Sequence, residues 1–205
     1  MHDDLMEYIQ KNFPGFWSDI HIRFELGEPF DNGTDERIEQ VVTRAHTLFD
    51  EVFARDSIVQ VYIQDWVAEP SVMFGNTTPG YLYELLSHHS LEERTMFQQD
   101  EDIDDTCHTI PVSIPCKIST LTSCLTAIPY REILTGIANY EQGREPSIGQ
   151  RVYFIDANRD IIFHLYDDRG CIIFAKEKEK LQSLYAKFND WLAEHWRPYF
   201  NELYR

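Results

Sequence analysis

The residues best suited to chemistry lie together near the end of a predicted strand in the last quarter of the chain. His164 and Tyr166 are two positions apart, so they share one face of that strand. The side chains of Asp167, Asp168 and Arg169 follow where the strand ends. A histidine and carboxylates beside an arginine could form a hydrolytic or phosphodiester site. These five residues are therefore the first candidates for a catalytic site.

The same segment also has the composition of a structured turn, and the sequence favours this second interpretation. Asp167 or Asp168 would accept hydrogen bonds from backbone N–H groups of the turn. Gly170 would supply a positive φ, and Arg169 would form an ion pair across the turn.

A second row of polar side chains occupies one face of a predicted strand near the N-terminus. Apolar residues alternate there with His21, Arg23 and Glu25, which is the period of a half-buried strand. Such a row could carry out acid–base chemistry on an anionic substrate, so Arg23 and Glu25 join the catalytic candidates. The favoured alternative is a solvated sheet face with cross-strand ion pairs.

No pattern in the chain predicts a cofactor or a metal centre. The four cysteines lack a zinc-ligand spacing and predict free thiols in a reducing cytoplasm. Asp100, Asp102 and Asp104 alternate as in a calcium-binding loop, but Asp105 and Pro111 occupy the positions that need glycine and glutamate. Phosphate-binding glycine loops are also absent. We therefore expect neither a cofactor nor a metal.

Charge is distributed unevenly along the chain. Its 205 residues include 18 Lys and Arg against 35 Asp and Glu, a net charge of −17. This excess of acid argues against binding to nucleic acids or anionic membranes. Residues 50–106 contain thirteen acidic residues against Arg55 and Arg94, a net charge of −11. This acidic segment predicts either ordinary solvated surface or a docking face for a basic partner.

Hydrophobic periodicity predicts the elements that must position these residues. Helices are expected over 3–12, 35–54, 81–87, 129–143 and 177–196, and strands over 19–26, 58–66, 108–119, 152–156, 161–166 and 171–175. Pro111 and Pro115 favour an edge strand for 108–119, and 91–106 has no clear period. The order predicts an α+β fold, with a mainly antiparallel or mixed sheet covered by helices, in a single domain over 1–205. The final helix should bury Leu184, Phe188 and Trp191.

Several segments together resemble an uncharacterised bacterial family, domain of unknown function 3885. The resemblance rests on the residues 19–27, 151–155, 162–170 and 185–192. It spans nearly the whole chain and departs from the family after the Asp-Asp-Arg-Gly turn, where Cys171 precedes two isoleucines instead of an acidic residue. The resemblance implies a cytoplasmic bacterial protein of one domain. It points to no particular activity and carries over no catalytic residue. The acidic N-terminus lacks the pattern of a signal peptide, and no apolar run is long enough for a bilayer.

Three functions from different classes fit the sequence. The favoured one is a non-catalytic binding protein that docks to or neutralises a basic protein partner, for example an immunity protein against a bacterial toxin. Its contact face would contain the exposed acidic residues of the densest run, Asp100, Glu101, Asp102, Asp104 and Asp105. The alternatives are a small hydrolase or nuclease at the strand end, and a structural or regulatory module that oligomerises through its aromatic C-terminal helix.

Overall fold

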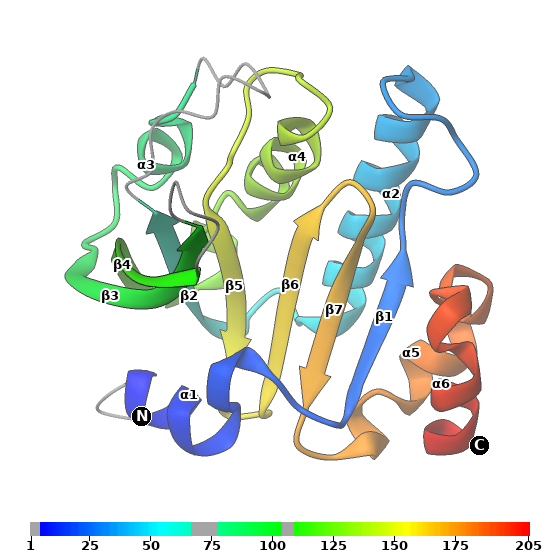
Figure 1. The fold of residues 1–205 in the computed structure, drawn as a ribbon. Helices are drawn as coiled ribbons and strands as arrows, with labels where there is room; N and C mark the ends of the chain where they lie inside the picture. The colour runs from blue at the N-terminus through cyan, green and yellow to red at the C-terminus, as the bar shows by residue number, and fades with distance from the viewer. Residues whose placement is uncertain (1–4, 67–77, 104–108) are drawn as a thin grey trace.

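The chain folds around one seven-stranded sheet in which every neighbouring pair of strands is antiparallel (Figure 1). The computed structural model describes residues 5–66, 78–103 and 109–205, with side chains described outside 98–103 and 109–112. The strand order is β1-β7-β6-β5-β2-β4-β3. The strands are His21–Glu25 (β1), Ile58–Trp66 (β2), Glu92–Ile103 (β3), Thr109–Cys124 (β4), Arg151–Asp156 (β5), Ile161–Asp167 (β6) and Gly170–Ala175 (β7).

In the described part of the chain, six α-helices and several short 3₁₀ turns connect and cover the strands. The helices are Leu5–Asn12 (α1), Asp35–Val52 (α2), Tyr81–Leu85 (α3), Tyr130–Tyr140 (α4), Gln182–Lys187 (α5) and Arg197–Tyr204 (α6). The 3₁₀ turns are Pro14–Phe16 (η1), Leu125–Ala127 (η2), Lys178–Lys180 (η3), Asn189–Trp191 (η4) and Glu194–Trp196 (η5). The protein is therefore an α+β fold, as the sequence predicts. None of the helices in the described part of the chain is both long and apolar enough to cross a membrane.

The two faces of the sheet bury different sets of side chains. On β6, Phe163 and Leu165 point into the main core, which also contains the apolar faces of α2 and α4. Ile162 points to the other face, where helix α1 packs through Tyr8 and Ile9 (Figure 1). The alternation follows from the period of two along a strand. Since α1 is only eight residues long, it covers only part of this second face.

Helix α2 matches its prediction because its sequence contains both a start signal and an apolar stripe. The Thr34 hydroxyl accepts a hydrogen bond from the Arg37 backbone N–H, which caps the helix. Asp35 and Glu36 in the first turn are favourable near the positive end of the helix dipole. Buried residues including Val41 then recur at helical spacing and join the main core.

The prediction of one long helix over 177–196 is wrong. The chain instead forms η3, α5, η4 and η5 before α6 begins at Arg197. The helix is interrupted because Leu192 forms a β-bridge with Phe24, and the Ala193 N–H donates to the Arg23 carbonyl. Pairing with the outer edge of β1 therefore overrides local helix propensity. Of the three side chains predicted as buried here, Leu184 and Phe188 are buried and Trp191 is partly exposed.

The segment without a clear period, 91–106, contains strand β3. This strand is hard to recognise because polar and charged side chains occupy both of its faces, so apolar residues do not alternate. The edge position expected for 108–119 is also wrong, since β4 pairs with both β2 and β3. Pro111 and Pro115 nevertheless lie beyond Cys116, where β3 is the only partner of β4 among the described residues.

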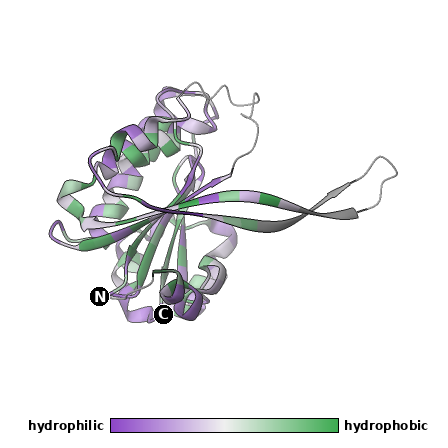
Figure 2. Cartoon of the chain, turned by 90° about the vertical axis from the view of Figure 1, so that its left-hand side faces the viewer, coloured by the Kyte–Doolittle hydropathy of each residue, from purple (hydrophilic) through white to green (hydrophobic). Residues whose placement is uncertain are grey.

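Beyond the Trp66–Cys116 pair, β3 and β4 continue as a ribbon in which, among the described residues, each strand pairs only with the other. We call this ribbon, residues 97–103 and 109–115, the arm. Its pairing runs from Phe97 with Pro115 to Ile103 with Thr109. The described base of the arm projects away from the body of the protein (Figure 2).

A buried ion pair joins α2 to the turn between β6 and β7. The Arg37 Nε donates to the Asp168 carboxylate at 2.5 Å, and both side chains are almost fully buried. Arg37 also donates to the Phe30 carbonyl. Removal of either side chain would leave the other as a buried charge without a counter-ion. The pair therefore holds the helix and the turn in a fixed relative position.

Replacement of Asp168 by Ala should therefore lower the free energy of unfolding by about 3–5 kcal/mol, because it leaves a buried guanidinium without its counter-ion. The control is Asp50→Ala, which breaks an ion pair to Arg131 whose side chains are 44% and 50% exposed. That change should cost less than about 1 kcal/mol. Urea denaturation of both variants measures the difference. Equal and small losses would show that the buried pair does not hold the turn.

Candidate functional site

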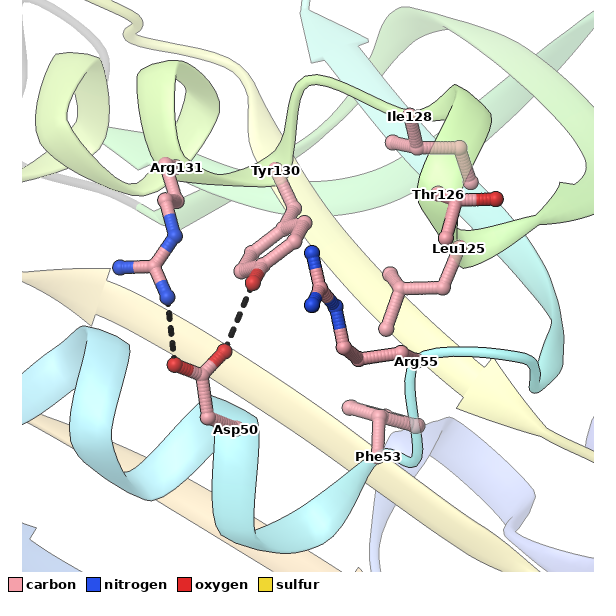
Figure 3. A pocket seen from close by; sticks show the side chains of 8 residues that line it. All are labelled: Asp50, Phe53, Arg55, Leu125, Thr126, Ile128, Tyr130 and Arg131. Atoms are coloured by element: carbon pink, nitrogen blue, oxygen red, sulfur yellow. Dashed lines mark hydrogen bonds and ion pairs between the residues drawn. The ribbon is translucent and has the colours of Figure 1, made fainter.

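One cavity lies where α2 ends and α4 begins, and its charged groups are mostly paired. It has a volume of about 600 Å³. Asp50 accepts hydrogen bonds from the Tyr130 hydroxyl at 2.7 Å and from Arg131 at 2.5 Å (Figure 3). Asp50 is the only carboxylate that lines this cavity, and it is already hydrogen-bonded to neighbouring side chains. This network links α4 to α2, and it leaves few unpaired polar groups in the cavity that could bind a ligand.

A second cavity of about 500 Å³ lies on the sheet face that α1 covers only in part. Side chains from η1, β1, β5, β6 and β7 line it, together with Arg169 from the β6–β7 turn. The lining contains three arginines, Arg23, Arg151 and Arg169, and no carboxylate. Because the protein as a whole has a net charge of −17, this concentration of positive charge is a local exception. We call this cavity the arginine pocket.

Arg23 and Tyr166 form the inner part of the arginine pocket. The guanidinium carbon of Arg23 lies 5.2 Å from the centre of the Tyr166 ring, a cation–π distance. The Arg23 Nε and the Tyr166 hydroxyl are both buried and have no hydrogen-bond partner among the described residues. Burial raises the pKa of Tyr166, and the nearby Arg23 acts in the opposite direction. Tyr166 is therefore a neutral hydrogen-bond donor.

His164 is a neutral, buried member of the same pocket. Its Nδ1 lies 2.9 Å from the Val152 carbonyl oxygen, and its ring stacks on Tyr153 with centroids 4.2 Å apart. Since a carbonyl oxygen only accepts hydrogen bonds, Nδ1 holds the proton and Nε2 is an acceptor. Burial lowers the pKa of His164 to about 4, and the charge of Arg151 acts in the same direction. At neutral pH the ring adds no charge to the pocket.

The two aspartates of the predicted catalytic group lie on the opposite side of the sheet. Asp167 and Asp168 are both buried, and Asp168 is held by Arg37 of α2. Their carboxylates cluster with that of Glu141, all within 4.8 Å of one another. Arg169 donates to Asp167 through its backbone N–H and its side chain. Two arginines therefore offset two of the three negative charges of this acidic cluster.

The prediction of a structured turn at these residues is confirmed in part. Asp167 accepts the backbone N–H of Arg169 at 2.7 Å and pairs with its side chain, as expected. The expected positive φ at Gly170 is wrong, because β7 begins there in an extended conformation. Glycine is needed for space: a Cβ would collide with the Phe24 carbonyl oxygen and the Tyr166 hydroxyl.

On strand β1, the expected solvated face with ion pairs is wrong. The residues opposite Arg23 and Glu25 on β7 are Ile172 and Gly170, which have no charge to offer. No ion pair forms at either Arg23 or Glu25 within the described ranges. Glu25 is not part of the lining of the arginine pocket. His21 is buried among aromatic rings, and burial lowers its pKa.

The structure thus brings together four of the seven predicted catalytic residues: His164, Tyr166, Arg169 and Arg23. Sequence reasoning missed Arg151 and two aromatic side chains, Phe16 at the end of η1 and Trp17 directly after it, which also line the pocket. The available signal was the alternation along 151–156, which places Arg151 and Tyr153 on one strand face. The segment around Pro14 offers no comparable signal.

The acidic residues predicted to bind a partner fall on or next to the arm. Asp100, Glu101 and Asp102 belong to β3 and pair with 110–112 of β4. Asp104 and Asp105 lie outside the described residues. Their role in binding therefore stays a prediction.

The low pKa of His164 predicts a specific acid sensitivity. Because the folded state resists protonation of this ring, stability is lost as pH falls below about 6.5, the unfolded value, towards the folded value of about 4. His164→Asn keeps a donor near the Nδ1 position but does not titrate. Between pH 7 and pH 4, wild type should lose about 3 kcal/mol more stability than this variant. Denaturation curves at several pH values measure the difference, and parallel losses would contradict the assignment.

Comparisons with known proteins identify a family but no activity. The chain is 34% identical over 70 residues to the uncharacterized protein YnaE of Bacillus subtilis strain 168. The aligned segment covers 31% of this chain and 33% of that protein. The chain thus matches only about a third of that relative's length. No solved structure matches. Residues 5–196 match the family described as domain of unknown function DUF3885, and the chain therefore belongs to that family.

Proposed function

We propose that this protein is a non-catalytic binding protein of the bacterial cytoplasm that docks a basic protein partner through the arm. The observation that carries the proposal is the exposure of large apolar side chains where the arm leaves the sheet. Met96 and Phe97 are 42% and 66% exposed. Phe97 is the most exposed of the large apolar residues in the described part of the chain.

These two side chains support a protein partner because of their place on the ribbon. Successive residues of a strand point to opposite faces, so Met96 and Phe97 present apolar surface on both faces of the ribbon. A two-stranded ribbon alone is marginally stable in water. Strand β3 is also the last strand in the sheet order of the described residues, and an edge strand is a site where another chain can pair. A partner that covers the ribbon would remove this apolar surface from water.

The charge of the same segment supports a basic partner. The acidic segment 50–106 contains strand β3 and has a net charge of −11. Opposite charges speed association through electrostatic steering and disfavour partners with a negative surface. An immunity protein that neutralises a basic toxin is one form of this proposal.

The two other functions have less support. A hydrolase at the strand end would need a carboxylate beside His164, but Asp167 and Asp168 lie across the sheet in ion pairs. An oligomerising module would need a free aromatic C-terminal face. Phe200 and Tyr204 are instead buried against the chain's own core.

The experiment compares two variants with the same net charge. The arm variant replaces Asp100, Glu101, Asp102, Asp104 and Asp105 by Lys. The control replaces five exposed acidic residues without ion pairs on other surfaces, Glu36, Glu39, Glu179, Asp190 and Glu202, by Lys. The partner is first isolated by affinity capture from the source bacterium and identified by mass spectrometry. Association rates are then measured at low and high salt.

We expect the arm variant to associate at least about 10-fold more slowly at low salt and to lose most of its salt dependence. The control should change the rate much less, and both variants should keep their circular dichroism spectra. A Phe97→Ser variant should speed dissociation. Equal slowing by both five-site variants would mean that overall charge, and not the arm, governs binding. A partner with an acidic surface would also contradict the proposal.

A further inference from the structure

We propose that the arginine pocket binds a small organic phosphate that carries a planar ring, the class to which mononucleotides belong. This inference is independent of the arm and goes beyond the proposed function, because the pocket and the arm belong to different parts of the sheet.

The charge of the pocket selects an anion. Arg23 and Arg151 both line it, and neither forms an ion pair with a carboxylate of the described residues. Arg169, the third arginine, is already paired with Asp167. Two guanidinium groups without counter-ions match the double charge of a phosphate monoester, and arginine binds phosphate through paired N–H donors. The excess of acid elsewhere would repel long polyanions, which favours a small ligand.

The unmatched hydrogen-bond donors at the inner end point to the same chemistry. Buried polar groups in folded proteins almost always have partners, so each exception requires an explanation. Here the Arg23 Nε and the Tyr166 hydroxyl are buried without one, side by side in one cavity. Both are donors, and a phosphate has only acceptor oxygens to offer them at neutral pH. An acceptor ligand would complete this pair.

The walls of the pocket suit a planar ring. Phe16 stacks on Tyr153 with centroids 3.9 Å apart, and Trp17 and Phe174 form a second aromatic side at 5.9 Å. Phe16 has a φ of +56°, a left-handed conformation that side-chain-bearing residues rarely take. Such backbone strain is concentrated at ligand-binding and catalytic sites. The cavity volume of about 500 Å³ lies in the range of small-molecule sites.

Isothermal titration calorimetry with three probes tests the proposal: AMP, inorganic phosphate and adenosine. AMP contains both the phosphate and the ring, so it should bind at least about 10-fold more tightly than either part alone. Arg23→Gln and Arg151→Gln should each weaken AMP binding by about 10-fold or more. The matched control is Arg55→Gln, which removes an exposed arginine from outside the pocket and should leave AMP binding unchanged.

Tyr166→Phe separates a binding role from a structural one. Because the hydroxyl has no partner in the protein alone, its removal should leave the melting temperature unchanged or raise it. AMP binding should nevertheless weaken several-fold. If this variant melts at a lower temperature and binds AMP normally, the hydroxyl is structural and the proposal fails.

Three further results would overturn the proposal. These are no heat of binding with AMP at about 5 mM, equal losses in Arg55→Gln and Arg23→Gln, and tighter binding of benzoate than of AMP. The first two would leave no specific anion site, and the third would make the ligand a carboxylate. The five-site arm variant should bind AMP like wild type, so failure here is distinguishable from failure of the proposed docking function.

Discussion

The buried ion pair between Arg37 and Asp168 determines how charge is divided between the two faces of the sheet. It fixes the end of β6 to helix α2, so the carboxylates of the turn lie on the helical side. Tyr166 and His164, on the alternate positions of the same strand, then face the other side. The lining of the arginine pocket consequently contains no carboxylate, although Tyr166 adjoins and Arg169 belongs to an acidic turn sequence. This separation leaves a pocket whose lining favours an anion, which is the basis of the proposed ligand site.

Charge is separated a second time, between distant parts of the chain. The acidic segment includes strand β3 of the arm, whereas Arg23 and Arg151, which form no ion pair with a described carboxylate, lie on the partly covered face of β1 and β5. A protein with a net charge of −17 would ordinarily repel a small anion, so a local positive site has to be built by excluding acids from its lining. Two surfaces of opposite charge can thus serve two different ligands without competing for the same residues.

Local patterns predicted much of the fold, and long-range contacts account for most of the rest. Strand β2 matches its predicted bounds because its side chains are apolar and β-branched or aromatic. The final helix was mispredicted because Leu192 pairs with Phe24, a partner far away in the sequence. The site was predicted in part, since His164 and Tyr166 are neighbours on one strand. Arg151 joins them only through sheet order, which no local pattern encodes.

The central claim is that the arginine pocket and the arm are separate binding surfaces. The most direct measurement is a ¹H–¹⁵N NMR titration of the whole chain with AMP. The account predicts shifts at the backbone amides of β1, β5, β6 and η1 around the pocket, with those of β3 and the arm unchanged. Shifts concentrated on the arm, or spread evenly over the positively charged surface residues, would contradict it.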